Sequence, residues 1–204
     1  MKKAAVLLML FCMTNQAFAE FNENKIRYGA NFALTMSKAN VVYSDVNNKF
    51  GTGAQGGLAM RIPYGKNRTL TTGLNVLYRS LETVDEIDLK TVETALSIPA
   101  LFKWDLLKLE SIESTVYFNA GFTLDIPLST KVKYRGSTED YADFHGNNRE
   151  RTPLDFGTLF GVGMCITGDI EVYWNIFGFS WNEFDKRIKS AYIYQTGIGV
   201  NYFF

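Results

Sequence analysis

The chain has 204 residues with 21 basic and 21 acidic side chains, so its formal net charge at neutral pH is zero. This balance gives no electrostatic reason to expect nucleic acid as a partner. Of the two cysteines, Cys12 falls in a segment predicted to be removed, which leaves Cys165 and excludes an intramolecular disulfide or a cysteine-based metal site.

Residues 1–19 have the pattern of a secretory signal peptide. Lys2 and Lys3 precede an apolar run over 4–13, and residues 17–19 (Ala-Phe-Ala) form a small-x-small cleavage site. The apolar run is too short for a spanning helix, and residues 20–204 contain no apolar stretch near 18 residues. We therefore expect export of the chain and a single mature domain over 20–204, with 19 basic and 21 acidic residues and a net charge of −2.

Eight segments of the mature chain alternate between apolar and polar residues, the period-two pattern of β-strands. Each has about ten or more residues, the length that a tilted strand needs to cross the hydrocarbon layer. In chain order these segments are 26–36, 50–62, 70–80, 91–104, 115–128, 154–166, 170–179 and 191–204.

The connections between these segments alternate strictly between long and short. The long ones are 37–48, 81–90, 129–152 and 181–189, and the short ones are 63–67, 105–110 and 167–169. In outer-membrane barrels the short turns are periplasmic and the long loops extracellular. The pattern predicts an all-β fold, an eight-stranded antiparallel up-and-down transmembrane β-barrel with both termini in the periplasm.

The sizes of the residues on the two strand faces favour lipid over a soluble core. One face is bulky and apolar in all eight strands, whereas the other is mostly Gly, Thr, Asn, Gln and charged. An eight-stranded interior is narrow, so the small face fits inside and the bulky face looks outward to lipid. The alternative is a soluble periplasmic calyx, lipocalin-like, with its apolar face around a ligand.

The inward face carries four cations and four anions. We expect them to form a buried network that plugs the barrel, because unpaired charges in a narrow interior are costly. The alternative is a small-ion pore, which eight strands leave little room to form. The residues of this lumen charge network are Arg27, Arg61, Arg79, Glu93, Lys103, Asp125, Asp155 and Glu171.

The last strand, 191–204, ends in an aromatic pair on its outward face, Tyr202 and Phe204. A long two-faced strand with a C-terminal Phe resembles the closing strand of a bacterial outer-membrane barrel. The resemblance implies that this strand carries the recognition signal for the barrel-assembly machinery, and that outer-membrane lipid surrounds the folded protein.

Two further stretches resemble the PorT-like outer-membrane β-barrel family. Residues 96–103 (LSIPALFK) are similar to that family's (E/S)-I-P-x-L-x-K strand, and residues 156–164 followed by 171–178 are similar to its glycine-rich strand and the strand after it. The resemblance implies a fold and a location and no particular activity. Pro99 lies within the first motif and removes a ladder donor, so we expect a bulge or weak pairing there.

No residues of the sequence form a recognisable catalytic, cofactor or metal site. His145, near Asp140 and Asp143 in the longest loop, is interpreted as a solvated loop residue because it has no placed nucleophile. Aromatic and charged loop residues suit surface contacts with an unknown extracellular or envelope partner; the candidates are Tyr134, Tyr141, His145 and Trp181. The leading hypothesis is therefore a non-enzymatic interaction or envelope-structural protein, with a lipid-modifying barrel enzyme and a secretion-system accessory component as alternatives.

Overall fold

The computed structural model describes residues 26–41, 48–65, 67–83, 89–110, 114–134, 136–140, 154–166, 168–182 and 191–204. The expected signal peptide and the candidate contact residues Tyr141 and His145 lie outside this part of the chain. In the described ranges, no helix is both long enough and apolar enough to cross a membrane.

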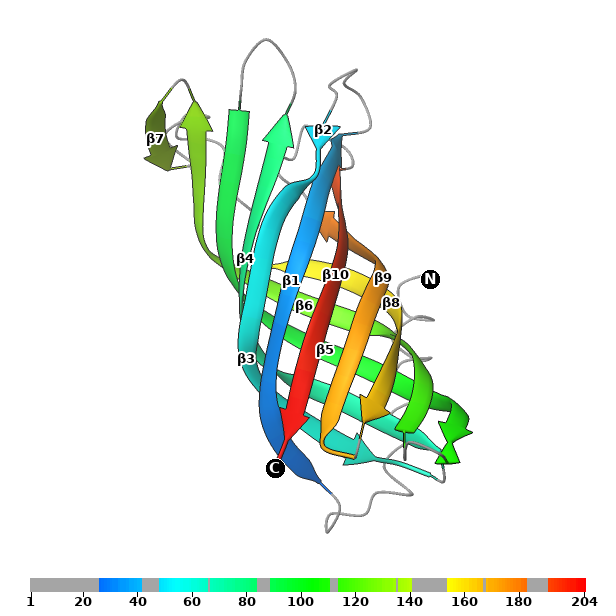
Figure 1. Ribbon diagram of the computed structural model, residues 1–204. Coiled ribbons are helices and arrows are strands. Elements are labelled where there is room, and N and C mark those ends of the chain that lie inside the picture. Colours follow the sequence, from blue (N-terminus) through cyan, green and yellow to red (C-terminus); the bar gives the residue numbers. More distant parts are fainter. Residues whose placement is uncertain are drawn as a thin grey trace, which may run out of the picture.

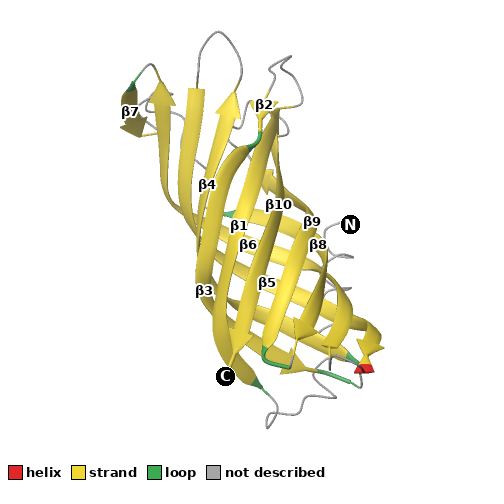
Figure 2. Ribbon diagram, viewed as in Figure 1, coloured by secondary structure: helices red, strands yellow, loops and turns green. Residues whose placement is uncertain are grey.

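Eight long antiparallel strands close into a barrel, as predicted, and the described chain is almost entirely strand (Figures 1 and 2). Each long strand pairs with the next along the chain, and β10 pairs with β1 to close the ring. The long strands are β1 (Arg27–Val41), β3 (Gly51–Pro63), β4 (Arg68–Thr83), β5 (Leu89–Leu109), β6 (Ser114–Tyr134), β8 (Asp155–Ile166), β9 (Ile170–Asn182) and β10 (Ala191–Phe203). Two short strands, β2 (Asn48–Lys49) and β7 (Ser137–Asp140), pair with β4 and β6.

The bulky apolar face points outward, as the alternation predicts. Leu34, Leu58 and Ile198 expose 62%, 68% and 62% of their surface, although each lies in the middle of a strand. The polar face is buried inside the barrel, where Asn75 and Asn119 are almost fully enclosed. Two apolar residues on the inward face of β10, Ile193 and Phe203, are also completely buried.

β-Bulges keep this inside–outside division where the sequence breaks its period of two. The extra residue in β9 leaves Ile176 and Phe177 both exposed, while the residues on either side stay buried. A similar register shift in β5 leaves Leu106 and Leu107 both exposed. A bulge inserts one unpaired residue and so restores the register of the buried face.

Pro99 weakens strand pairing, as expected from its missing N–H. The ladder between β4 and β5 runs from Thr72↔Ala100 to Asn75↔Ser97 without pairing at Ile98 and Pro99, and its register does not change. The interruption is therefore a gap in the ladder and not a bulge.

Several predicted connections are shorter than expected because strands extend into them, and in two of them a strand continues past a register shift. The segment 105–110, expected to be a turn, continues β5 as far as Leu109, and the first part of the long loop 129–152 continues β6 to Tyr134 and then forms β7. In both places a register shift, at Leu106 and at Leu128, interrupts the alternation. The sequence pattern therefore ends at the bulge although the hydrogen-bonded ladder does not.

Two inward tyrosines lie against glycines of the neighbouring strands. The Tyr117 ring covers Gly163 on β8, and the Tyr173 ring covers Gly199 on β10; a Cβ atom at either glycine would collide with the ring. Both tyrosines are buried, and they pack with Ala33 as an apolar cluster inside the lumen. The missing Cβ atoms therefore make room for aromatic side chains in a narrow interior.

We expect Gly199→Ala to destabilise the barrel by about 1–3 kcal/mol, the usual cost of overpacking, because the added methyl group meets the Tyr173 ring and the Cβ of Ala33. The thermal midpoint of the mobility shift between folded and heated protein on SDS gels measures this loss. Gly56→Ala is the matched control, since its Cβ would meet no atom closer than 3.5 Å. Equal midpoints for the two variants would show that the Tyr173 contact carries no constraint.

Candidate functional site

The eight charged residues of the predicted lumen network all lie on the inward face, and seven of them form two clusters. The first cluster surrounds Arg79, whose guanidinium lies 2.5 Å from Glu93, 2.9 Å from Asp155 and 3.5 Å from Asp125. All four side chains are at most 5% exposed. One guanidinium therefore faces three carboxylates in an enclosed space, where charge pairing is strong and unpaired charge is costly.

The second cluster surrounds the Glu171 carboxylate, which pairs with both Lys103 and Arg61. The Arg61 Nη1 lies 3.3 Å from Glu171 Oε1, and the Asn201 amide donates to Oε2 at 2.9 Å. The Arg61 guanidinium also stacks on the Phe203 ring, 4.5 Å from its centroid, and donates to the Gly168 carbonyl. Here two cations face one carboxylate, so the excess charge is positive.

Arg27 lies beside the second cluster, at the end of the barrel where the β8–β9 turn meets the C-terminal strand, and it shares the Gly168 carbonyl with Arg61. It pairs with Asp169 at 2.6 Å and donates to the carbonyls of Gly168 and Phe203 at 3.0 and 3.1 Å. Both side chains of this pair are part-exposed, so it joins the turn to the strand at the rim and does not fill the lumen.

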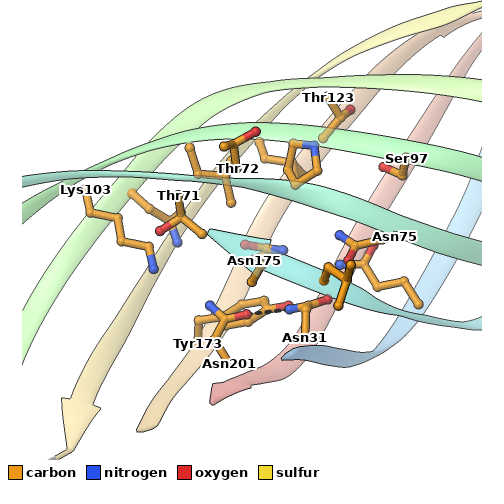
Figure 3. Close-up of a pocket in the computed structure, with 17 residues that line it drawn as sticks. Asn31, Thr71, Thr72, Asn75, Ser97, Lys103, Thr123, Tyr173, Asn175 and Asn201 are labelled. Carbon is orange, nitrogen blue, oxygen red and sulfur yellow. Dashed lines mark hydrogen bonds between the residues drawn. The ribbon is translucent and has the colours of Figure 1, made fainter. Parts of the chain in front are cut away.

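Two small polar cavities separate the clusters. The larger, about 30 Å³, is lined by Lys103 of the second cluster and by inward asparagines from several strands (Figure 3). The smaller, about 20 Å³, is lined by Asp125 of the first cluster. The two cavities share four lining residues, Gln55, Ser97, Thr123 and Leu159. Each has room for only one or two water molecules.

The sequence analysis did not predict the hydrogen bonds between uncharged side chains inside the barrel. The Asn31 amide donates to the Tyr173 hydroxyl at 2.7 Å and to Asn201 Oδ1 at 2.6 Å, which joins β1, β9 and β10 (Figure 3). These residues occupy the same inward positions as the charged ones, so the alternation places them inside. No sequence pattern indicates that they meet, because their contacts depend on the stagger between strands.

The candidate contact residues Tyr134 and Trp181 lie in strands and not in loops, which corrects the prediction for both. Tyr134 ends β6, where its carbonyl accepts a hydrogen bond from the Ser137 hydroxyl at 2.8 Å in the turn to β7. Trp181 lies in β9 and pairs through its backbone with Tyr192. Both ladders extend beyond the end of the apolar alternation, so the sequence pattern places these strand ends too early.

The C-terminal aromatic pair lies on the outer surface of the closing seam. Tyr202 pairs with Ala30 of β1, and the Phe204 amide donates to the Tyr28 carbonyl at 2.9 Å. The rings of Tyr202 and Phe204 are 6.5 Å apart and exposed. The seam between the first and last strands therefore continues to the C-terminus.

The profile of a family described as an outer membrane protein beta-barrel domain matches residues 15–181. The chain belongs to this family. It is an outer-membrane β-barrel protein, and the soluble calyx alternative is therefore excluded.

Solved structures similar to this outer-membrane barrel include Ail, the attachment invasion locus protein of Yersinia pestis. Its sequence is 10% identical, the match covers 88% of this chain and 99% of that chain, and the TM-score is 0.45. Neisserial surface protein A has 16% identity, 87% and 97% coverage and a TM-score of 0.46. The outer membrane enzyme PagL has 12% identity, 83% and 97% coverage and a TM-score of 0.44. A comparison with curated proteins gives no significant match.

Aromatic side chains on the outside of the barrel fit its place in a bilayer. Tyr28, Tyr78 and Tyr202 are about half exposed on the outward face, where amphipathic rings suit the membrane–water interface. A second group gathers on β9 and β10, where the Phe179 ring lies 4.9 Å from Tyr192 and 5.6 Å from Tyr194. In the described part of the chain, no group of three or more His, Cys, Asp or Glu side chains could hold a metal ion.

Proposed function

We propose that this outer-membrane barrel is a non-enzymatic scaffold with a plugged lumen, acting through the part that it presents beyond the extracellular side of the membrane. The observation that carries the proposal is strand length. β4, β5 and β6 have 16, 21 and 21 residues, whereas about 9–11 suffice to cross the hydrocarbon layer. Figure 1 shows the ends of β5 and β6, with β7 at the edge, standing beyond β8 and β9.

The side chains of this extension favour water over lipid. The outward residues of β6 are apolar as far as Leu128, beyond which Lys131 and Lys133 are exposed. Across the ladder on β5, Lys90 pairs with Glu82 of β4 at 2.7 Å. Charged outward residues are costly in the hydrocarbon layer and ordinary above it. We define the sheet extension as residues 89–92, 131–134 and 137–140, and place it outside the bilayer.

The filled lumen favours a scaffold function and argues against a pore. Two buried ion-pair clusters, the Tyr117 and Tyr173 rings and two cavities of about 20 and 30 Å³ occupy the described interior. Buried, mutually paired charges also stiffen a barrel where they join strands that are not neighbours, as Arg79 on β4 does with Asp155 on β8 and Lys103 on β5 with Glu171 on β9. A rigid cylinder is a suitable base for a binding surface held on strands.

The test asks which end of the barrel faces the outside of the cell. In a Cys165→Ser background, a single cysteine is introduced at Thr138 in β7 or at Lys108 near the opposite end of β5, both exposed positions. We expect a membrane-impermeant maleimide to label Thr138→Cys at least tenfold more than Lys108→Cys on intact cells. Long connections are extracellular in such barrels and short turns periplasmic.

Permeabilised cells provide the control, since both cysteines should then react to the same extent. Labelling of Lys108→Cys but not of Thr138→Cys on intact cells would place the sheet extension in the periplasm. An extracellular binding role would then be wrong, and a periplasmic partner would replace it.

Within the family, we place the chain near the PorT-like barrels on the motifs at 96–103 and 156–178. In the structure, the first motif forms the central part of β5 with the ladder gap at Pro99, and the second forms β8 and β9. Both motifs therefore build the wall of the barrel. They support a shared architecture and bear on no shared activity.

A further inference from the structure

The lumen contains buried oxygen atoms that have no hydrogen-bond partner among the described residues. Around the larger cavity they include Oδ1 of Asn75, Asn119 and Asn175, from β4, β6 and β9, on residues that are at most 6% exposed; Asn31 Oδ1 and Thr71 Oγ1 line the same cavity. The smaller cavity is lined by Asp125 and Ser180, 4% and 7% exposed, whose Oδ1 and Oγ atoms are likewise unpartnered. Buried polar atoms are nearly always satisfied, so these cavities are built to hold something polar.

The charges around the cavities are unequal. Arg79 faces three carboxylates, so the cluster beside the smaller cavity has a formal excess of two negative charges. The Glu171 cluster has an excess of one positive charge from Lys103 and Arg61. The two clusters together therefore carry one more negative than positive charge. A single positive charge between them would balance these described lumen groups.

We propose that the smaller cavity binds one monovalent alkali cation, K⁺ or Na⁺, with Asp125 Oδ1 as its charged ligand and Ser180 Oγ as a neutral one. The larger cavity holds the water molecules that complete the hydration of the cation and donate hydrogen bonds to the asparagine oxygens. This site is independent of the orientation and the binding role proposed above.

The chemistry of the lining favours an alkali cation over other occupants. Carboxylate, hydroxyl and amide oxygens are hard ligands, and rings of neutral oxygens can replace the hydration shell of K⁺. A divalent ion would reverse the sign of the charge imbalance, and Mg²⁺ gives up its water shell reluctantly. An anion is excluded from this position by the three carboxylates around Arg79.

The test compares the full-length folded barrel in detergent at equal ionic strength in KCl, NaCl and N-methyl-D-glucamine chloride, whose cation is too large for a cavity of about 20 Å³. A ligand that binds only the folded state raises its stability. We expect the thermal midpoint of the gel mobility shift to be about 2–4 °C higher in KCl or NaCl. Equal midpoints in the three salts would overturn the proposal, since water or a proton would then balance the site.

Single substitutions test which residues cause the dependence of the thermal midpoint on the salt. Asp125→Asn should abolish the difference in thermal midpoint between the salts. Ser180→Ala should reduce that difference, and it serves as the test if Asp125→Asn does not fold. Asp169→Asn removes a rim carboxylate that pairs with Arg27 at 2.6 Å and should keep the full difference. A crystal soaked in RbCl should show an anomalous peak beside Asp125. An unchanged salt response in both lumen variants, or a peak elsewhere in the lumen, would show that this site is wrong.

Discussion

Arg79→Met is expected to destabilise the folded barrel by about 3–5 kcal/mol, the effect of removing one partner from a buried ion pair. The Arg79 guanidinium is fully buried and is the cation within 3.5 Å of Glu93, Asp125 and Asp155. Without it, three carboxylates repel one another in a space that water reaches poorly. Urea titration of the barrel in lipid vesicles, followed by tryptophan fluorescence, measures the change in the free energy of unfolding.

The matched control is Lys90→Met, which removes a cation from the exposed pair with Glu82. That pair has the same chemistry at 2.7 Å, but its side chains are 40% and 36% exposed, so the expected loss is below about 1 kcal/mol. Combining Arg79→Met with Glu93→Gln and Asp155→Asn should recover part of the stability, because only the Asp125 carboxylate then remains of the three uncompensated charges. Similar losses for Arg79→Met and Lys90→Met would show that the lumen cluster is well hydrated and is not a plug.

Ile198→Arg is expected to cost about 2–4 kcal/mol, the value for a cation facing lipid near the bilayer midplane. Ile198 lies on the outward face of β10, opposite Leu34 and Trp174, and 62% of its surface is exposed. In water such a position would tolerate arginine. The cost is therefore specific to a face covered by hydrocarbon, and the same urea titration in vesicles measures it.

Thr138→Arg provides the comparison for this substitution. Thr138 is exposed in β7, within the sheet extension that we place outside the bilayer, and a surface change of this kind usually alters stability by less than about 0.5 kcal/mol. If arginine is tolerated equally at both positions, the outward apolar band does not contact lipid. If Thr138→Arg is the more costly of the two, the boundary of the membrane lies higher on β6 than the exposed lysines indicate.

Most of the fold could be predicted from the sequence because a barrel wall has two distinct environments. A period of two records which side of the wall each residue faces, so residues such as Leu58 and Asn75 were assigned to the correct face without any knowledge of their neighbours. The alternation of long and short connections then fixed the order of the strands. The ends of β5 and β6 were predicted too early because bulges at Leu106 and Leu128 shift the period by one residue.

The composition of the lumen could be predicted, but its contacts could not. The alternation placed Arg79 and Glu171 inside, yet it contains no information on the stagger between strands, which decides which inward residues lie at the same height. The stagger brings Asp155 to Arg79 and Lys103 to Glu171, and it leaves Arg27 at the rim with Asp169. The packing of the Tyr117 and Tyr173 rings against glycines of the neighbouring strands depends on this stagger in the same way.

The seam between β1 and β10 determines the order in which the barrel can fold. Every other long strand pairs with its predecessor along the chain, so seven hairpin-type ladders involve residues that are near one another in sequence. The seam instead joins Gly29 to Phe203 and Val41 to Ala191, across almost the whole described chain. Loop closure over such a distance is entropically costly, and topologies with distant contacts fold slowly. Before β10 pairs with its two neighbours, β1 and β9 each have an open edge, so we expect closure of the ring to be the late and slow step of assembly.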